Sequence, residues 1–565
     1  WAQTCALVVA SNALPRDLRW KSSGSTWDAT APNWIRPATG TTEVFAGGDR
    51  VVFDQAGIAR PSVTVVDTVA PGSIDVDATG NYSLAGSGTV GCTGALTKRG
   101  AGTFTLGNNG TNSFSTVFLE AGTLVLPNAT GGGASRISFN GGALVSAPPS
   151  NTSIPNALEF NQPATITVGS QHTCSGNWTG SQTVTVNATG SQLWTVAGSW
   201  TGFSGRLQAG TGNPRFRLNG NSNLNFGSPS VAVDLGSGTA QLMNRNGATI
   251  ELGALSSTGA GTVLSGAQSS NTASTYRIGG LNSTTTFAGA IVDGSYNNLP
   301  AVTHIVKTGS GELVLTGTST YSGTTTVSQG VLNVAGTLGG TAVTVASGAM
   351  LAGSGTLGGA VAASAGAILS PGTPPFTGAT LTVGGGLALN NNTLYFDMSS
   401  SPAGANDRIV MMNGGTLGLT GTIHFQFLLL EGTLGPGTYE LVTGATTSTA
   451  SGVGLTHNLP AASRQTFALS RPAAGSNPSY IRLTVTGNPA TLAWTGAASA
   501  VWDAASANWT GATPGVFYPN DAVVFDDTSV VNGITIAGEV QPRSIRFNHN
   551  TRSYTLGGGV GGTAG

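Results

Sequence analysis

The run VKTGSGELVLTGTSTYSGTTTVSQGVLNVAGTLGGTAVTVASGAMLAGSGTLGGAVAASAGAILSPG, from Val306 to Gly372, decides the fold of this chain. Its short segments, such as Leu313–Leu315 and Val343–Val345, place apolar residues at every second position, which is the pattern of a half-buried β-strand. Glycine-rich corners separate these segments. Strands this short cannot bury a face alone, but successive coils of one chain can bury it against each other. We therefore expect a stack of β-coils.

The same unit recurs earlier in the chain. Lys98–Leu126 and Lys307–Val334 share a K-x-G-x-G corner, an alternating strand, an aromatic-Ser pair and an x-G-x-L step. No stretch has the apolar spacing of an amphipathic helix. The sequence predicts an all-β protein, a right-handed parallel β-helix over residues 93–386 with an interior of Val, Leu, Ile, Phe and Ala.

A second, longer repeat joins the two ends of the chain. LRWKSSGSTWDATAPNW (Leu18–Trp34) matches LAWTGAASAVWDAASANW (Leu492–Trp509), and the match continues beyond both segments. We expect a Trp-rich β module at residues 19–92 and an incomplete second copy at residues 491–565. Residues 387–490 have longer alternating strands that look antiparallel, so small β-sandwich-like or curled-sheet modules are expected beside the helix.

The start of the chain also has a counterpart. CALVVASN (Cys5–Asn12) precedes the first Trp-rich module as IRLTVTGN (Ile481–Asn488) precedes the second, so residues 1–18 are interpreted as the closing strand of a preceding unit. Unpaired ends of a β-helix need a cover. Head-to-tail continuation is therefore expected, through other subunits or through further repeats of one polypeptide. The predicted assembly segment consists of Ala6, Leu7, Val8, Val9 and Ala10.

Composition excludes several classes of protein. Glycine accounts for 86 of 565 residues, and 22 basic residues balance 23 acidic ones. Low charge argues against nucleic-acid partners, and a hydrophobic fraction of 39% argues against disorder. No apolar run approaches the roughly 18 residues of a membrane span. The three cysteines, Cys5, Cys92 and Cys174, are too few and too scattered for a disulfide scaffold or a zinc site.

Residues for catalysis are sparse. Between residues 78 and 292 the acidic residues are isolated: Glu120, Glu159, Asp234 and Glu251. A polysaccharide hydrolase needs two carboxylates in one groove, so no catalytic residue, metal or cofactor is expected. Aspartates gather in two places and could hold calcium, although we favour turn formation for them: Asp67, Asp75 and Asp77 in one, and Asp49 and Asp54 with their counterparts Asp521, Asp526 and Asp527 in the other.

Two roles are open for the tryptophans of the two modules. Trp27, Trp34, Trp502 and Trp509 could form a platform on which sugar rings stack. The favoured alternative is that they form the core of their own module, while the neighbouring Asp and Asn residues hold its turns.

Val306–Gly372 resembles the bacterial autotransporter-associated β-strand repeat, also called the passenger-associated transport repeat, and ends in the SPG typical of it. The resemblance implies a β-helical protein that is secreted or exposed on the bacterial surface, and it implies no catalytic residues. The leading hypothesis is a structural building unit of an extracellular filament, whose partners are identical subunits. The alternative is an adhesin that binds glycans or the cell envelope, and a polysaccharide-active enzyme ranks third.

Overall fold

The computed structural model of the protein describes residues 14–21, 23–219, 225–373, 378–412, 414–471, 473, 475 and 479–558. The predicted assembly segment, Ala6 to Ala10, lies outside the described residues. Two units share the chain: residues 1–313 with 321–323 form the first, and residues 314–320 with 324–565 form the second.

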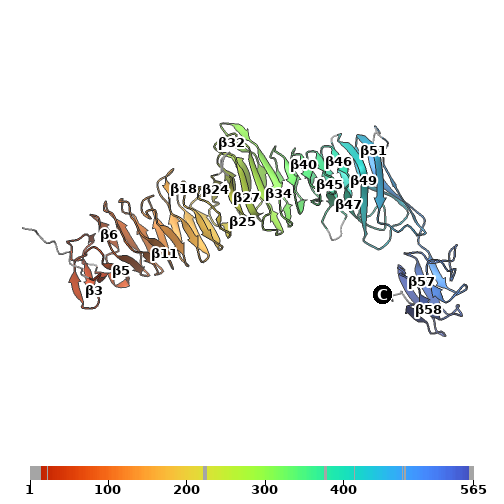
Figure 1. Cartoon of the computed structure of the whole chain (residues 1–565), viewed down its shortest axis with the longest axis horizontal. Helices are drawn as coiled ribbons and strands as arrows, with labels where there is room; N and C mark the ends of the chain where they lie inside the picture. The colour runs from red at the N-terminus through yellow and green to blue at the C-terminus, as the bar shows by residue number, and fades with distance from the viewer. Residues whose placement is uncertain are drawn as a thin grey trace, which may run out of the picture. The chain divides into compact units, whose positions relative to one another are not determined.

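In the first unit, parallel strands from successive coils stack in register on each face. One face contains β7 (Ser73–Asp77), β9 (Leu96–Lys98), β11 (Thr116–Leu119) and β13 (Arg136–Phe139). A second face contains β8 (Tyr82–Ala85), β10 (Thr103–Leu106), β12 (Thr123–Leu126) and β14 (Ala143–Ser146). Leu96 pairs with Ile74 on one side and Val117 on the other, so each coil adds one rung (Figure 1).

Helix is nearly absent from the described residues, where one 3-10 turn, Gln55–Gly57, stands among sixty strands. The predicted all-β solenoid is confirmed.

Alternation along each short strand decides which side chains enter the core. In β10, Phe104 and Leu106 are fully buried, while Thr103 and Thr105 lie partly in solvent. Stacking of the coils then places side chains of the same type next to each other. The ring centroids of Phe139 and Phe160, for example, lie 5.0 Å apart on adjacent coils. Val, Leu, Ile, Phe and Ala dominate the core as predicted, and tryptophans and buried asparagines join them.

Glycine is required where one coil turns against the next. Gly122 has φ +67°, and a Cβ there would lie 2.3 Å from the carbonyl oxygen of Gly100 on the preceding coil. Neither the left-handed backbone nor this approach suits an L side chain.

The second unit continues the same arrangement. One ladder runs through β37 (Thr325–Val327), β40 (Val343–Val345), β43 (Val361–Ala363) and β46 (Leu387–Asn390). The next runs through β38 (Val331–Val334), β41 (Met350–Gly353), β44 (Ile368–Pro371) and β47 (Thr393–Met398). The long strand β49 (Thr416–Leu429) pairs in parallel with both β46 and β47.

The expected antiparallel pairing of residues 387–490 needs a correction. Parallel pairing extends through β49 to β51 (Thr447–His457) and from β48 (Arg408–Met411) to β50 (Gly437–Ala445). Antiparallel pairing is found where β53 (Ser479–Thr486) lies between β50 and β52 (Thr466–Ser470). Strand length and alternation are the same for both directions. The edge offered by the preceding coil decided the direction. The boundaries at residues 92, 386 and 490 stay predictions.

The two Trp-rich modules share one pairing scheme. The first contains β1 (Asp17–Trp20), β2 (Thr26–Trp27), β3 (Trp34–Arg36), β4 (Thr41–Glu43), β5 (Arg50–Asp54) and β6 (Ser62–Val65). The second contains β54 (Thr491–Trp494), β55 (Val501–Trp502), β56 (Trp509–Thr510), β57 (Ala522–Asp526), β58 (Gly533–Ile536), β59 (Ser544–Asn548) and β60 (Thr555–Gly558). In each, the first strand pairs antiparallel with a tryptophan strand and parallel with the VVF strand.

Candidate functional site

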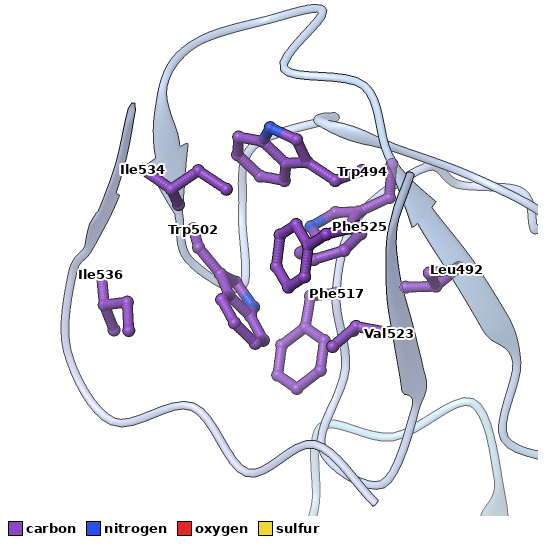
Figure 2. Close-up of a cluster of buried hydrophobic side chains, with 9 residues drawn as sticks. Leu492, Trp494, Trp502, Phe517, Val523, Phe525, Ile534 and Ile536 are labelled. Carbon is purple, nitrogen blue, oxygen red and sulfur yellow. The ribbon is translucent and has the colours of Figure 1, made fainter. Parts of the chain in front are cut away.

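The tryptophans of both modules lie in closely similar aromatic clusters. Trp494 and Trp509 meet edge to face with centroids 5.0 Å apart, as Trp20 and Trp34 do at 5.1 Å. Figure 2 shows Trp494, Trp502, Phe517 and Phe525 of the second module pointing toward one another. Edge-to-face contacts of this kind add to the stabilisation that burial gives.

Burial decides between the two interpretations of these residues. Trp27, Trp34 and Trp502 are fully buried, and Trp509 is 5% exposed. A platform for sugar rings needs an exposed ring face, which none of the four provides. The geometry therefore supports the role of module core.

The polar neighbours of these tryptophans hold turns. Asp28 accepts backbone hydrogen bonds from Thr30 and Ala31 at 2.7 and 2.6 Å, as Asp503 does from Ala505 and Ser506. Burial alone would raise the pKa of Asp28, but the backbone N–H groups of Ala31 and Thr30 hold it below its ordinary value. These carboxylates act as turn formers.

Several of the aspartates considered for calcium have other partners. Asp49 is 3% exposed and bonded to the Arg16 guanidinium, and Asp521 is fully buried and bonded to Arg464. Asp527 accepts three backbone N–H groups, from Asn550, Thr551 and Arg552, which lower its pKa to about 2. Across the described ranges, no group of three or more His, Cys, Asp or Glu side chains could hold a metal ion.

The buried histidine and cysteines lie in the core. His172 is 2% exposed, hydrogen-bonds Ser146 and the carbonyl of Ser170, and has its pKa lowered by burial. Cys92 and Cys174 are free and buried, and burial raises the pKa of Cys174 to about 11. A thiol with a raised pKa is a poor nucleophile at neutral pH. Cys5 lies outside the described residues.

The lysine of the K-x-G-x-G corner has a structural role that the sequence analysis missed. Lys307 is 1% exposed, and its Nζ donates to the carbonyls of Thr308 and Gly309 at 2.7 and 2.9 Å. Lys98 lies at the same place in the other repeat and donates to the carbonyls of Gly100 and Ala121. The recurrence of lysine at the same position of both repeats was the sequence signal that could have indicated this role.

A surface groove in the first unit lacks a pair of carboxylates for glycoside hydrolysis. Its volume is about 690 Å³, and its lining is mostly Ser, Thr and Ala with Leu281, Arg206 and Asp234. Asp234 is the one carboxylate of this lining, and it is paired with Arg206. A glycosidase pair is therefore not assembled in this groove.

An exposed apolar edge distinguishes the second module from the first. Ile545 and Phe547 of β59 are 46% and 49% exposed, whereas their counterparts Ile74 and Val76 of β7 are 1% exposed. In the first module, β9 pairs with β7 and covers these positions. In the second, β59 pairs with β57 on one side, and no described strand pairs with its other side.

These features together define a protein of the β-solenoid class, with aromatic cores in two homologous modules. The family model of the passenger-associated-transport-repeat matches residues 96–126 and 305–334, so the chain contains two such repeats. The repeats coincide with β9 to β12 and β34 (Thr303–Lys307) to β38, and the resemblance drawn from the sequence is confirmed. Comparison with curated proteins gives no match. Among the described residues, no helix is long and apolar enough to cross a membrane.

Proposed function

We propose that this protein is a structural building unit of a bacterial extracellular or surface filament, in which copies associate head to tail. The passenger-associated repeat and the solenoid fold support a secreted or surface-exposed passenger-type protein. Several outward arginines pair with a carboxylate on a neighbouring coil, and the tryptophans of both modules are buried. These features suit a structural protein.

The repeated coil carries the proposal. Successive coils pair strand to strand, and the edge of β59, where Ile545 and Phe547 are about half exposed, offers the same pairing to a further coil of the same polypeptide or of another copy. In the first module a further coil does pair with β7, and the equivalent side chains there are only 1% exposed. A second copy that supplies this coil would use surfaces different from β59, and such a heterologous contact generates an open filament.

The test replaces the apolar edge with charge. Ile545→Asp with Phe547→Asp places two carboxylates where the next coil would pack, and we expect concentration-dependent association of the full chain to be lost. Sedimentation velocity measures the association, and electron microscopy shows whether filaments form.

Arg546→Asp is the matched control because Arg546 lies between these residues on the same strand and points to the opposite face. This variant should associate like the parent protein. A parent protein that stays monomeric at all concentrations, or a double variant that assembles normally, would refute the proposal.

A further inference from the structure

Three arginines from two adjacent coils lie on one outer face of the first unit. They belong to the sheet formed by β15 (Ser153–Ile154), β18 (His172–Cys174), β21 (Leu193–Val196), β24 (Arg215–Leu218), β26 (Gln241–Asn244), β28 (Val263–Ala267) and β31 (Ala290–Val292). Arg215 and Arg217 alternate along β24 with Phe216 and Leu218, which are fully buried. Both arginines therefore point outward.

Arg245 joins them from the next coil. Leu218 pairs with Asn244, and the backbone N–H of Arg245 donates to the carbonyl of Leu218 at 2.9 Å, so Arg245 lies beside Asn219. Its Nη1 donates to Asn219 Oδ1 at 3.0 Å. Adjacent coils are about 4.8 Å apart, so the three guanidinium groups lie along one strip of this sheet face.

The chain supplies too few carboxylates here to neutralise them. Residues 161–292 contain five arginines and two acidic residues, Asp234 and Glu251. Asp234 pairs with Arg206, and Glu251 pairs with Arg277 at 2.9 Å. The surplus is the cluster of Arg215, Arg217 and Arg245.

Within the described residues, the hydrogen bonds of the cluster go to neutral oxygens. Arg215 Nε donates to Gln241 Oε1 at 3.2 Å, and Arg217 Nε donates to Thr195 Oγ1 at 2.9 Å. The next carboxylate along the chain, Asp293, accepts from the backbone of Thr303 and Ser322. The described residues place no ion pair on any of the three.

The three positive charges of the cluster repel one another. Burial, and then the positive charges of Arg245 and Arg215, lower the pKa of Arg217 below its ordinary value. Elsewhere in the same unit, an outward arginine faces a carboxylate on the next coil, as Arg136 faces Glu159. Bound oxyanions would relieve the repulsion in the cluster, and a guanidinium can donate two hydrogen bonds to one oxyanion.

We propose that Arg215, Arg217 and Arg245 form a binding site for a linear polysaccharide that carries carboxylate or sulfate groups. The three groups spread over two coils of a sheet face and do not converge on one point, so they suit successive charges of an extended polymer. The proposal is independent of head-to-tail assembly.

The test compares two triple variants of equal charge change. Arg215→Gln, Arg217→Gln and Arg245→Gln together remove the cluster. Arg99→Gln, Arg136→Gln and Arg277→Gln remove three arginines of the same unit that pair with carboxylates. Circular dichroism and thermal unfolding confirm that each variant is folded. Binding of polygalacturonate, dextran sulfate and neutral dextran is measured at low salt and at physiological salt.

The parent protein should bind one or both charged polymers, and the affinity should fall with salt. The cluster variant should bind about tenfold more weakly, because it loses three charge-assisted contacts, while the control variant stays within about twofold. The preferred polymer distinguishes carboxylate from sulfate recognition. Equal losses in both variants, binding of neutral dextran alone, or equally strong binding of inorganic phosphate would overturn the proposal.

Discussion

Arg464 holds the fully buried carboxylate of Asp521, with Nε 2.9 Å from Oδ2. The arginine comes from the segment before β52, and the aspartate directly precedes β57, the VVF strand of the second Trp-rich module. The first module fills the same position with a different partner, because Asp49 binds Arg16, which immediately precedes β1. One buried carboxylate in each module is thus neutralised by an arginine from a different part of the fold.

Arg464→Met should destabilise the second module strongly. Removal of one partner leaves the Asp521 charge buried, which costs about 3 kcal/mol or more in the free energy of unfolding. Urea denaturation followed by tryptophan fluorescence measures the change. Arg482→Met breaks an ion pair with Glu440 that is about one-third exposed, and should cost less than about 1 kcal/mol. Equal costs for the two variants would contradict the structural role given to Asp521.

Lys307 should make the stability of the repeat depend on pH. Burial lowers its pKa in the folded protein to about 8, from 10.5 when unfolded, and Glu312 opposes this shift. Between these values the unfolded chain binds more protons than the folded one, so stability rises with pH and reaches its full gain above the unfolded pKa of 10.5.

Lys307→Met removes this proton linkage, so the stability of the parent protein relative to the variant should grow between pH 7.5 and pH 10. The growth should be on the order of 2 kcal/mol. Buried tyrosines titrate in both proteins and cancel in the difference. Unfolding midpoints in urea at the two pH values test this, and a constant gap would show that Lys307 is not the titrating group.

Trp502→Ala should strongly destabilise the second module, because Trp502 belongs to its core. The side chain is fully buried against Phe517 and Phe525, so its removal leaves a cavity that costs about 3 kcal/mol or more. Tyr395→Ala, at a position that is 37% exposed, is the control and should change stability by about 1 kcal/mol or less. Differential scanning calorimetry separates the two outcomes. Unchanged stability in Trp502→Ala would revive the sugar-platform interpretation.

Gly122→Ala should cost more than an ordinary glycine substitution. A Cβ at Gly122 would lie 2.3 Å from the carbonyl oxygen of Gly100, in addition to the strain of φ +67°. Gly190 also has positive φ, +76°, but no atom lies within 4 Å of its added Cβ. We expect a cost of about 1 kcal/mol at Gly190 and at least twice that at Gly122, measured by thermal unfolding. Similar costs would mean that coil contact adds nothing to backbone strain.

Deletion of residues 1–13 tests the predicted assembly segment, which includes Ala6 to Ala10. If this segment completes a neighbouring copy, the deletion should abolish filaments, while the thermal unfolding of the coils stays the same because Arg16 and its bond to Asp49 are retained. Filaments that persist after the deletion would leave the β59 edge to be covered by some other part of a copy.

The class of fold follows from local sequence patterns. Two local features of the sequence are sufficient for this. Alternation in segments such as Thr103–Leu106 indicates which side chains point inward, and glycine at tight corners such as Gly122 indicates where the chain bends. Repetition of one coil with the same pattern then implies stacking, because no single coil can bury its apolar face.

The tertiary structure decided the rest. Parallel pairing of β49, burial of Lys307, exposure of Phe547 and the gathering of Arg217 with Arg245 all depend on which coil lies beside which. Val76 and Phe547 occupy equivalent positions of the repeated Trp-rich module. Val76 is a core residue because β9 lies beside its strand, whereas Phe547 is about half exposed. Alternation assigns a side chain to a face of its strand, and a neighbouring coil determines whether that face meets protein or water.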